Sequence, residues 1–498
     1  MKNPRPRPTL QPEYCKGCLR CVDACPKHCI TQSTELNPLT GLTPVELHLE
    51  DCNGCQLCIE ACPEPYGLLP EQPPRGPVAT DANGDFDLED PRHLFGAKAQ
   101  TLPSPVAIED EVIALAKTEP MMLKGTYASA LGALLAGCRH VFGYPITPST
   151  EGAELMAKTL PKLGGAFVQA VSEVAAINMI YGCAGAGLPS MTFTSSPGLS
   201  LMLEGISYMV GAELPAVIVN IMRGGPGLGN IAPEQADLKL MARGLGHGNT
   251  HAIVLAPSTP QEMLDLTMLA FTLAFRYRNP VLVAGDGYLG QMAGVVRLPE
   301  AMVRPGLPAW SVFGDRAHRT NLVCSIQLRE DDLENHNRHL LAKYEAISKA
   351  EQRAESWLCD DAEVLVLACN TPARMAKGAV ADLRAQGIKA GLFRPITVWP
   401  FPIEALRPHL LRGVRLAMVE ASPGQLEDEA RLAISRAGLA TPSIQAIQRY
   451  GGVLPARGEI VRAVMEELGG GRDESRGHGG SGRDESRGHG ASGHGGVA

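Results

Sequence analysis

At 498 residues the chain is longer than one hydrophobic core usually supports, so we expect two or three domains. Apolar residues make up 45% of it and the formal net charge is -8, which leaves no broad basic field to attract nucleic acid or anionic lipid. The opening MKNPRPRPTL lacks the apolar core of a signal peptide, and no apolar stretch is long enough to span a bilayer. We therefore expect a cytoplasmic protein that binds neither nucleic acid nor membrane.

Cysteines dominate the first part of the chain. Nine of the fourteen lie between Cys15 and Cys62. Because the cytosol keeps thiols reduced, such a density indicates metal ligation rather than disulfides. The spacing C-x2-C-x2-C-x3-C followed by proline occurs twice, at Cys15, Cys18, Cys21 and Cys25 with Pro26 and at Cys52, Cys55, Cys58 and Cys62 with Pro63.

This spacing is typical of two [4Fe-4S] clusters, in which the fourth cysteine of each run ligates the other cluster. Two four-thiolate zinc sites are the alternative, but zinc motifs rarely show two successive two-residue gaps before a three-residue gap and Cys-Pro. Cys29 belongs to neither motif, and we interpret it as a small buried thiol. We predict one cluster on Cys15, Cys18, Cys21 and Cys62 and the second on Cys52, Cys55, Cys58 and Cys25.

Residues 1–68 are thus predicted to form a small bacterial-ferredoxin-like α+β domain, and residues 69–118, rich in Pro, Gly and Asp, a linker. From 119 to 296 an α/β pattern follows. Its apolar runs AVIVNIM, AIVLA and VLVAG, at 216–222, 252–256 and 281–285, indicate buried parallel strands.

Between the last two runs, Thr259, Pro260 and Glu262 supply a helix cap, a first-turn proline and a capping-box glutamate. Strand, helix and strand in this order predict a βαβ unit.

Residues 297–358 are predicted to form a connector that ends in a polar helical stretch. Residues 359–468 return to the α/β pattern, with strands expected at 362–369, 391–396 and 414–422. Residues 469–498 repeat GRDESRGHG and cannot form a core, so we expect a disordered tail. We interpret its histidines as chance members of that tail rather than as a metal site; they are His478, His489 and His494.

Four segments of the central domain resemble, in the same order, the α subunit of 2-oxoacid:ferredoxin oxidoreductases. They are GYPITPST, AVSEVAA, TSSPGLSLMLEGISY and VNIMRGGPGLGN. The resemblance runs from Met121 to Leu468 and is closest to the 2-oxoisovalerate (branched-chain) type, while the first domain is similar to the two-cluster δ subunit. It implies a thiamine-pyrimidine-type parallel-sheet domain followed by a transketolase-carboxyl-terminal-like α/β domain.

That family cleaves a 2-oxoacid on thiamine diphosphate with Mg2+, passes electrons through iron-sulfur clusters to ferredoxin, and forms acyl-CoA and CO2 with CoA. Glu173 matches the glutamate that contacts the pyrimidine ring and promotes proton removal. Thr147 and Arg223 match residues that bind the substrate, for which a guanidinium offers a planar, charge-assisted fork. The turn that carries Thr147 is implied to contact the cofactor through Tyr144, Pro145 and Ile146.

From the residues alone, other interpretations stay open. Without the resemblance, Glu173 fits better as a solvated glutamate at a helix start, stabilised by the helix dipole, and the turn around Thr147 fits better as a structural element. The loop GGPGLGN at 224–230 does not fit G-x-G-x-x-G, so it is not read as a dinucleotide loop.

Gly285-Asp286-Gly287 resembles the start of the metal-diphosphate motif of thiamine enzymes, but no asparagine occurs between Gly287 and Asn321. The resemblance therefore implies that a β subunit holds the diphosphate and Mg2+ and that a γ subunit completes the enzyme. Pyruvate or 2-oxoglutarate as substrate, the carboxylating direction, and a non-catalytic electron-transfer subunit stay open as alternatives.

Overall fold

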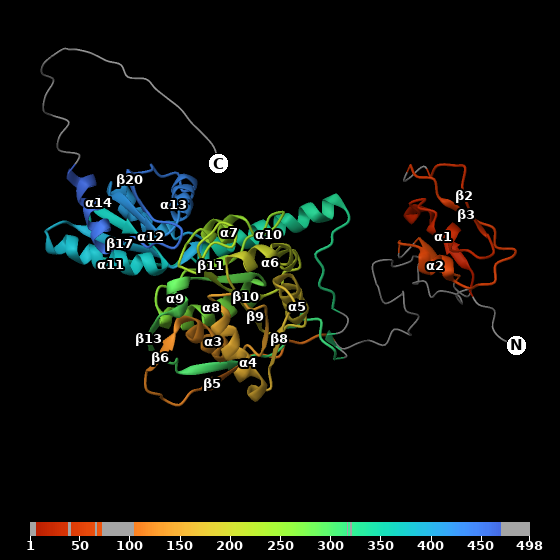
Figure 1. Ribbon diagram of the computed structural model, residues 1–498, viewed down its shortest axis with the longest axis horizontal. Coiled ribbons are helices and arrows are strands. Elements are labelled where there is room, and N and C mark those ends of the chain that lie inside the picture. The colour runs from red at the N-terminus through yellow and green to blue at the C-terminus, as the bar shows by residue number, and fades with distance from the viewer. Residues whose placement is uncertain are drawn as a thin grey trace, which may run out of the picture. The chain divides into compact units, whose positions relative to one another are not determined.

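The computed structural model describes residues 6–37, 41–64, 67–71, 104–315, 317–318 and 321–469 (Figure 1). The chain divides into two compact units, Met1–Thr101 and Leu102–Ala498. Most of the predicted linker, and the predicted tail from residue 470 onward, lie outside the described residues. None of the described helices is long and apolar enough to cross a membrane.

The described part of the first unit contains two antiparallel strand pairs, two short α-helices and one 3-10 helix. Its core is formed by buried cysteines together with Ile30, Val45 and Leu68. Each α-helix begins inside one of the cysteine runs. The pairs are β1 (Pro8–Leu10) with β4 (Leu68–Pro70) and β2 (Ile30–Gln32) with β3 (Val45–Leu47), and the helices are η1 (Pro12–Tyr14), α1 (Arg20–Asp23) and α2 (Leu57–Ala61).

The second unit is built around a seven-stranded sheet with the order β18-β11-β12-β10-β9-β7-β8. All its neighbouring strands are parallel except β18, which runs antiparallel to β11. The central strands are buried throughout, as expected for continuous apolar runs covered on both faces. The strands are β7 (His140–Gly143), β8 (Ala166–Gln169), β9 (Ser190–Thr194), β10 (Ala216–Met222), β11 (Ile253–Leu255), β12 (Pro280–Asp286) and β18 (Thr397–Trp399).

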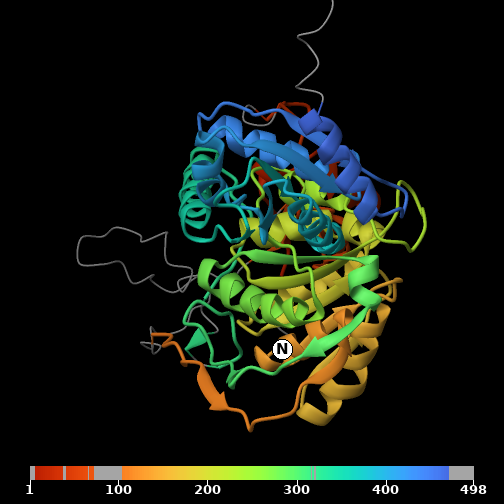
Figure 2. The same cartoon turned by 90° about the vertical axis from the view of Figure 1, so that its left-hand side faces the viewer.

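Helices cover both faces of this sheet (Figure 2). α3 and α8 pack on each other against one face, and α5 and α6 pack on each other against the other. The helices of this part are α3 (Gly125–Leu135), α4 (Thr150–Thr159), η3 (Leu160–Leu163), α5 (Glu173–Gly185), α6 (Ser196–Gly211), α7 (Asp237–Arg243), α8 (Pro260–Tyr277), α9 (Gly287–Gln291) and α10 (Glu330–Ala350).

The predicted start of α8 is only partly confirmed. Thr259 Oγ1 accepts the N–H of Glu262 at 3.1 Å, as a cap should. The Glu262 carboxylate, however, accepts the N–H of Ser258 at 2.7 Å instead of that of Thr259, and it also binds Arg394. The predicted capping box is therefore wrong in this detail. The Glu262 carboxylate instead pairs with the guanidinium of Arg394, which lies on a distant strand.

A second, five-stranded sheet has the order β15-β17-β16-β19-β20. The three strands predicted between 359 and 468 are confirmed as β16, β17 and β19, and β15 is antiparallel to β17. Its elements are β15 (Ala354–Trp357), β16 (Val364–Leu367), β17 (Ala390–Pro395), β19 (Arg415–Glu420), β20 (Ile444–Gln448), α11 (Asn370–Ala385), α12 (Ile403–Leu411), α13 (Gln425–Arg436) and α14 (Arg457–Gly469).

Two strand ribbons lie outside the two large sheets, and one of them lies within ranges that were predicted to connect domains. β5 (Glu111–Ala114), in the predicted linker, pairs with β14 (Ala301–Arg304), in the predicted connector. A second ribbon joins β6 (Met121–Lys124) to β13 (Ala293–Val296). Parts of both connecting ranges therefore belong to the second unit, and the domain boundaries stay predictions.

Candidate functional site

Two cavities in the first unit are each lined by a quartet of cysteines from the two runs, and Cys29 lines the second cavity as well. Each quartet combines three cysteines of one run with the fourth cysteine of the other, as the spacing predicts. This grouping fits two cubane clusters, while the assignment of each thiol as a ligand stays a prediction. One cavity is lined by Cys15, Cys18, Cys21 and Cys62, and the other by Cys25, Cys52, Cys55 and Cys58.

The two cysteine loops share the same backbone conformation. Gly17 and Gly54 have φ angles of 64° and 66°, and Leu19 and Gln56, two residues later, have 61° and 67°. A Cβ on Gly17 would lie 2.3 Å from the carbonyl oxygen of Thr43, so a side chain does not fit there. The repeated left-handed residues bend each loop so that its thiols line one cavity.

The alternative of two zinc sites makes a demand on where the thiols lie. A zinc ion needs its sulfur ligands about 2.3 Å from a single point. Within the described residues, no group of three or more His, Cys, Asp or Glu side chains could hold one metal ion. A cubane distributes its ligands over four irons, so its four sulfurs need not meet at one point.

Burial governs the chemistry of the innermost thiols. It raises the pKa of Cys21 to about 11, with smaller contributions from the neighbouring Cys62 and Cys15. Burial, followed by the neighbouring Cys25, also raises the pKa of Cys58. Since iron binds thiolates, assembly of a cluster on these residues has to release protons.

Cys29 is buried, as predicted, and it also lines the second cavity. Its backbone N–H donates to the sulfur of Cys25 at 3.3 Å. Hydrogen bonds to ligand sulfurs are one of the factors that set cluster potentials. Spacing could not indicate this role, because the donor is a main-chain group.

The predicted residues of the second unit lie at the carboxyl edge of the seven-stranded sheet, where β7, β9 and β10 end. Glu173 is the first residue of α5, whose cap is Ser172, with its Oγ accepting the N–H of Ala175 at 3.2 Å. The Glu173 side chain is only 4% exposed. This low exposure does not fit a solvated helix-start glutamate, and no group among the described residues donates a hydrogen bond to its carboxylate.

The glycine that opens α6 explains how this carboxylate fits. A Cβ on Gly198 would lie 2.5 Å from Glu173 Oε1 and 2.3 Å from Thr194 Oγ1. Gly198 therefore provides the space in which the glutamate rests. An unpaired, buried carboxylate held in this way can take up a hydrogen bond or a proton from a bound group, and the site thus fits the pyrimidine side of thiamine diphosphate.

Arg223 and the turn after β7 are in direct contact. Arg223 Nη1 donates to the carbonyl oxygen of Thr147 at 2.7 Å, and Nη2 donates to that of Leu228 at 3.3 Å. The buried Nε has no acceptor within the described residues. Because a guanidinium has five N–H donors, Arg223 keeps donors for an anionic ligand.

A hydrogen bond from α9 anchors the turn after β7, and several of its side chains are exposed to solvent. Thr147 precedes a cis bond to Pro148, whose carbonyl oxygen accepts from Gln291 at 2.9 Å. Tyr144, Pro145 and Thr147 are exposed to solvent. The structure therefore brings Thr147 and Arg223 together on an open surface, and the first turn of α6 links them to Glu173, since Ser196 Oγ accepts the N–H of Arg223 at 3.0 Å.

A cavity of about 600 Å³ lies beside Arg223. Its walls come from both sheets of the second unit: Ser196, Ser200 and Arg223 on one side and Tyr450 on the other. In the glycine loop at 224–230, the N–H of Gly225 donates to the Glu234 carboxylate at 2.7 Å, so this amide is used within the protein. The loop shapes a wall rather than a phosphate cradle.

Asp286 does not offer a metal ligand. It is buried, and its carboxylate accepts four hydrogen bonds from the N–H groups of Tyr288, Leu289 and Thr371 and the Thr371 hydroxyl, at 2.8 to 3.1 Å. Burial raises its pKa. The residue that resembles the start of a metal-diphosphate motif instead joins the first sheet to α11.

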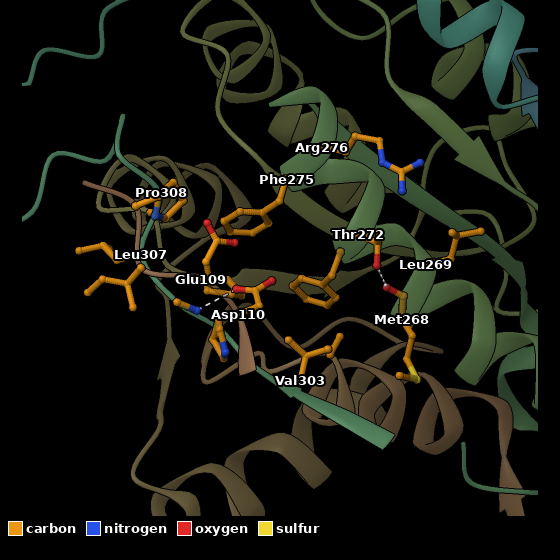
Figure 3. Close-up of a pocket in the computed structure, with 18 residues that line it drawn as sticks. Glu109, Asp110, Met268, Leu269, Thr272, Phe275, Arg276, Val303, Leu307 and Pro308 are labelled. Carbon is orange, nitrogen blue, oxygen red and sulfur yellow. Dashed lines mark hydrogen bonds between the residues drawn. The ribbon is translucent and has the colours of Figure 1, made fainter. Parts of the chain in front are cut away.

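Another cavity, of about 460 Å³, lies at the opposite edge of the sheet (Figure 3). It is lined by Phe275 and Leu269 from α8, by Val303 from β14, and by Glu109 and Asp110. None of the predicted site residues lines it. In open parallel sheets ligands bind at the carboxyl ends of the strands, so the candidate site is the one around Glu173 and Arg223.

The fold and the site together define the class of this protein. It is an α/β chain of the thiamine-dependent enzymes, and it also carries a two-cluster module. The chain matches the family model "Pyruvate flavodoxin/ferredoxin oxidoreductase, thiamine diP-bdg" over 131–356, the "Pyruvate:ferredoxin oxidoreductase core domain II" over 362–460, and the "4Fe-4S dicluster domain" over 14–65. It is 48% identical to the ketoisovalerate oxidoreductase subunit VorB of Methanothermobacter marburgensis over 71% of this chain and 99% of VorB.

It is also 34% identical to the 2-oxoglutarate synthase subunit KorA of Methanothermobacter thermautotrophicus, over 70% of this chain and 99% of KorA. Among solved structures it resembles the 2-oxoglutarate:ferredoxin oxidoreductase of Magnetococcus marinus with 2-oxoglutarate, coenzyme A and succinyl-CoA bound, at a TM-score of 0.64 and 26% identity, covering 70% of this chain and 66% of that one. The chain belongs to the 2-oxoacid:ferredoxin oxidoreductase family, as the resemblance predicted.

Sequence reasoning missed Gly198 and Thr194. Both lie in or next to the segment TSSPGLSLMLEGISY, which was noted for its resemblance only. A glycine two residues into a helix that follows a strand could have indicated a close approach, but only the fold shows what approaches it.

Exchanging cysteines tests the crossed pairing of the two quartets. We expect Cys62→Ala and Cys25→Ala each to lower the iron content by about four atoms per chain, because each removes one ligand of a different cubane. Cys29→Ala should keep the full iron content. Iron analysis with electron paramagnetic resonance of the reduced protein measures this, and loss of iron in Cys29→Ala alone would contradict the assignment.

Gly198→Ala tests the close approach at Glu173. The added methyl group must displace the carboxylate, and a displacement of this size is expected to lower kcat by about 100-fold. Gly182→Ala in α5 is the matched control, since a Cβ there meets no atom within 4 Å. Turnover of the assembled enzyme and cluster absorbance should be measured together. Normal turnover in Gly198→Ala would show that the carboxylate position is unimportant.

Proposed function

We propose that this chain supplies the α-type half-site and the cluster module of an enzyme that converts a 2-oxoacid and CoA to acyl-CoA and CO2. Electrons leave through two [4Fe-4S] clusters to ferredoxin. The observation that carries the proposal is the donor-free, buried carboxylate of Glu173 at the same sheet edge as the Arg223–Thr147 contact. The names of the relatives support the same reaction class.

Glu173 acts as the proton-transfer group. When bound, thiamine diphosphate supplies the nucleophilic carbon and the electron sink for decarboxylation. The Glu173 carboxylate receives and returns a proton at the cofactor's pyrimidine ring, which its burial and lack of other donors make possible.

Arg223 and Thr147 bind the substrate. The free guanidinium donors of Arg223 suit the carboxylate of a 2-oxoacid, and the contact with the Thr147 carbonyl fixes the direction of the guanidinium. Thr147, exposed in the turn, offers its hydroxyl to the same ligand. Tyr144, Pro145 and Ile146 form the surrounding wall toward the cofactor.

We further propose a branched-chain 2-oxoacid such as 2-oxoisovalerate as the substrate. Its support is the 48% identity to the ketoisovalerate oxidoreductase subunit, compared with 34% to a 2-oxoglutarate synthase subunit. Discrimination between substrates that differ by a methylene rests on only about 1–3 kcal/mol, so pocket shape decides it.

A second chain is needed to complete this site. Asp286 is fully engaged, so we propose that a β subunit holds the diphosphate and Mg2+, with a γ subunit and ferredoxin as further partners. Apolar side chains surround the open site, with Val171 88%, Leu228 82% and Ile231 60% exposed. Such a patch at the carboxyl edge suits a protein interface. We also propose a cytoplasmic location, because none of the fourteen cysteines, all of which lie among the described residues, forms a disulfide.

The function is tested by co-expressing the chain with candidate β and γ subunits and measuring CoA-dependent reduction of a viologen dye. Among several 2-oxoacids, we expect branched-chain ones to give the highest kcat/KM. Glu173→Gln should lower kcat by about 100-fold or more, because the amide cannot accept the proton.

Cluster absorbance of Glu173→Gln should equal that of the unaltered protein, which separates chemistry from assembly. If no 2-oxoacid supports reduction in a fully loaded complex, the proposed reaction is wrong. If Glu173→Gln turns over normally, the wrong carboxylate was chosen.

The proposed β interface is tested by placing charge in the exposed patch. We expect Val171→Asp and Leu228→Asp each to raise the Kd for the β subunit by about tenfold or more, since a carboxylate would have to be desolvated there. Leu411→Asp is the control, because Leu411 at the end of α12 is 72% exposed and lies in the other sheet's domain. Equal binding of all three variants would place the β subunit elsewhere.

A further inference from the structure

Thr194 is the last residue of β9 and lies at the carboxyl edge of the sheet. It is fully buried, with an exposure of 0%, yet its hydroxyl oxygen has no hydrogen-bond partner among the described residues. Leaving a buried hydroxyl unpaired is costly, so such groups call for a specific explanation. The sequence analysis gave Thr194 no role.

The hydroxyl lies next to the Glu173 carboxylate. Both Thr194 Oγ1 and Glu173 Oε1 approach the point where a Cβ of Gly198 would be, at 2.3 Å and 2.5 Å. The two oxygens therefore lie on the same side of α6 and near each other, although no hydrogen bond joins them in this structure. One belongs to a hydroxyl with a free proton, and the other to a carboxylate that accepts no hydrogen bond in the described part of the chain.

The chemistry of the two groups is complementary. A threonine hydroxyl donates one hydrogen bond, and its hydrogen rotates to suit the acceptor. An ionised carboxylate only accepts, and it has room for several donors on its two oxygens. A hydroxyl donor on one oxygen leaves the other oxygen for the cofactor. The backbone of Thr194, fixed in the sheet opposite Asn220, provides a rigid anchor for this donor.

We propose that Thr194 is a positioning residue whose hydroxyl donates to the Glu173 carboxylate and holds it in place for proton transfer with the pyrimidine ring. This inference rests on the function proposed for Glu173. It explains why a polar side chain ends a buried strand, and why residue 198 carries no side chain between them.

The same strand provides a matched control. Thr192 lies two residues earlier, so its side chain is on the same face of the sheet, and it is also fully buried. Its hydroxyl approaches the carbonyl oxygen of Phe193 at 3.4 Å and faces Gly143 at the end of β7. Thr192→Val therefore removes an equivalent hydroxyl that is not adjacent to Glu173.

The test compares Thr194→Val, Thr194→Ser and Thr192→Val in the complete complex with its β and γ subunits. Valine keeps the shape and removes the donor, so Thr194→Val should fold normally with full cluster absorbance. We expect its kcat to fall by about tenfold or more with KM for the 2-oxoacid unchanged, because Glu173 is less well positioned. Thr194→Ser should restore most of the rate, and Thr192→Val should match the unaltered enzyme.

A second readout does not depend on turnover. The rate at which the thiazolium carbon of bound thiamine diphosphate exchanges its proton for deuterium is measured by NMR after acid quench, without any 2-oxoacid. We expect Thr194→Val to slow this exchange by the same factor as kcat, and Thr194→Ser to restore it.

The outcomes separate this inference from the proposed function. If Glu173→Gln abolishes exchange while Thr194→Val exchanges at the normal rate, only the role of Thr194 is overturned. If Glu173→Gln exchanges normally, the function proposed for Glu173 fails first. Equal slowing in Thr194→Val and Thr192→Val would also overturn the inference, because it would reduce the effect to general packing of β9.

Discussion

Removal of the Glu173 carboxylate from water is the constraint on which the rest of the second unit depends. A buried carboxylate without donors costs several kcal/mol unless its surroundings compensate. Here Glu173 is the first residue of α5, and α6 approaches it closely through Gly198. Both helices pack on a sheet whose central strands are buried throughout. The free energy gained from this large apolar core offsets the cost of burying one carboxyl group.

The site around Glu173 needs a rigid frame, and this requirement explains why the two sheets of the second unit are joined by several contacts. β18 adds to the edge of the first sheet although its neighbours in sequence belong to the second. Arg394 from β17 forms ion pairs with Glu262 at the start of α8 and with Glu355 of β15, and Asp286 binds Thr371. These contacts join the two sheets, and Tyr450, which follows the second sheet's β20, lines the cavity beside Arg223. The domain built on the five-stranded sheet therefore shapes the site, but it supplies none of the predicted catalytic residues.

How far the sequence could predict the structure depends on how local each cause is. The cysteine quartets follow from spacing, because the loops repeat one conformation over a few residues. Buried strands such as Ala216–Met222 follow from continuous apolar runs. The partner of Glu262, the contact of Arg223 with the Thr147 carbonyl, and the neighbours of Gly198 join residues far apart in the chain. Periodicity contains no information about such pairs, and only family resemblance assigned roles to Thr147, Glu173 and Arg223.

The site is asymmetric in its exposure, and this asymmetry constrains how it can work. Glu173 is withdrawn from water, whereas Thr147 and Tyr144, only a short way along the same edge, are exposed. Charge interactions with a substrate carboxylate are weak in water and strengthen when water is excluded. In the proposed function, the Arg223 guanidinium therefore binds a 2-oxoacid firmly only after another surface covers the turn. We infer on the same basis that assembly with the proposed second chain changes the dielectric around Arg223, so that substrate binding and subunit assembly are coupled.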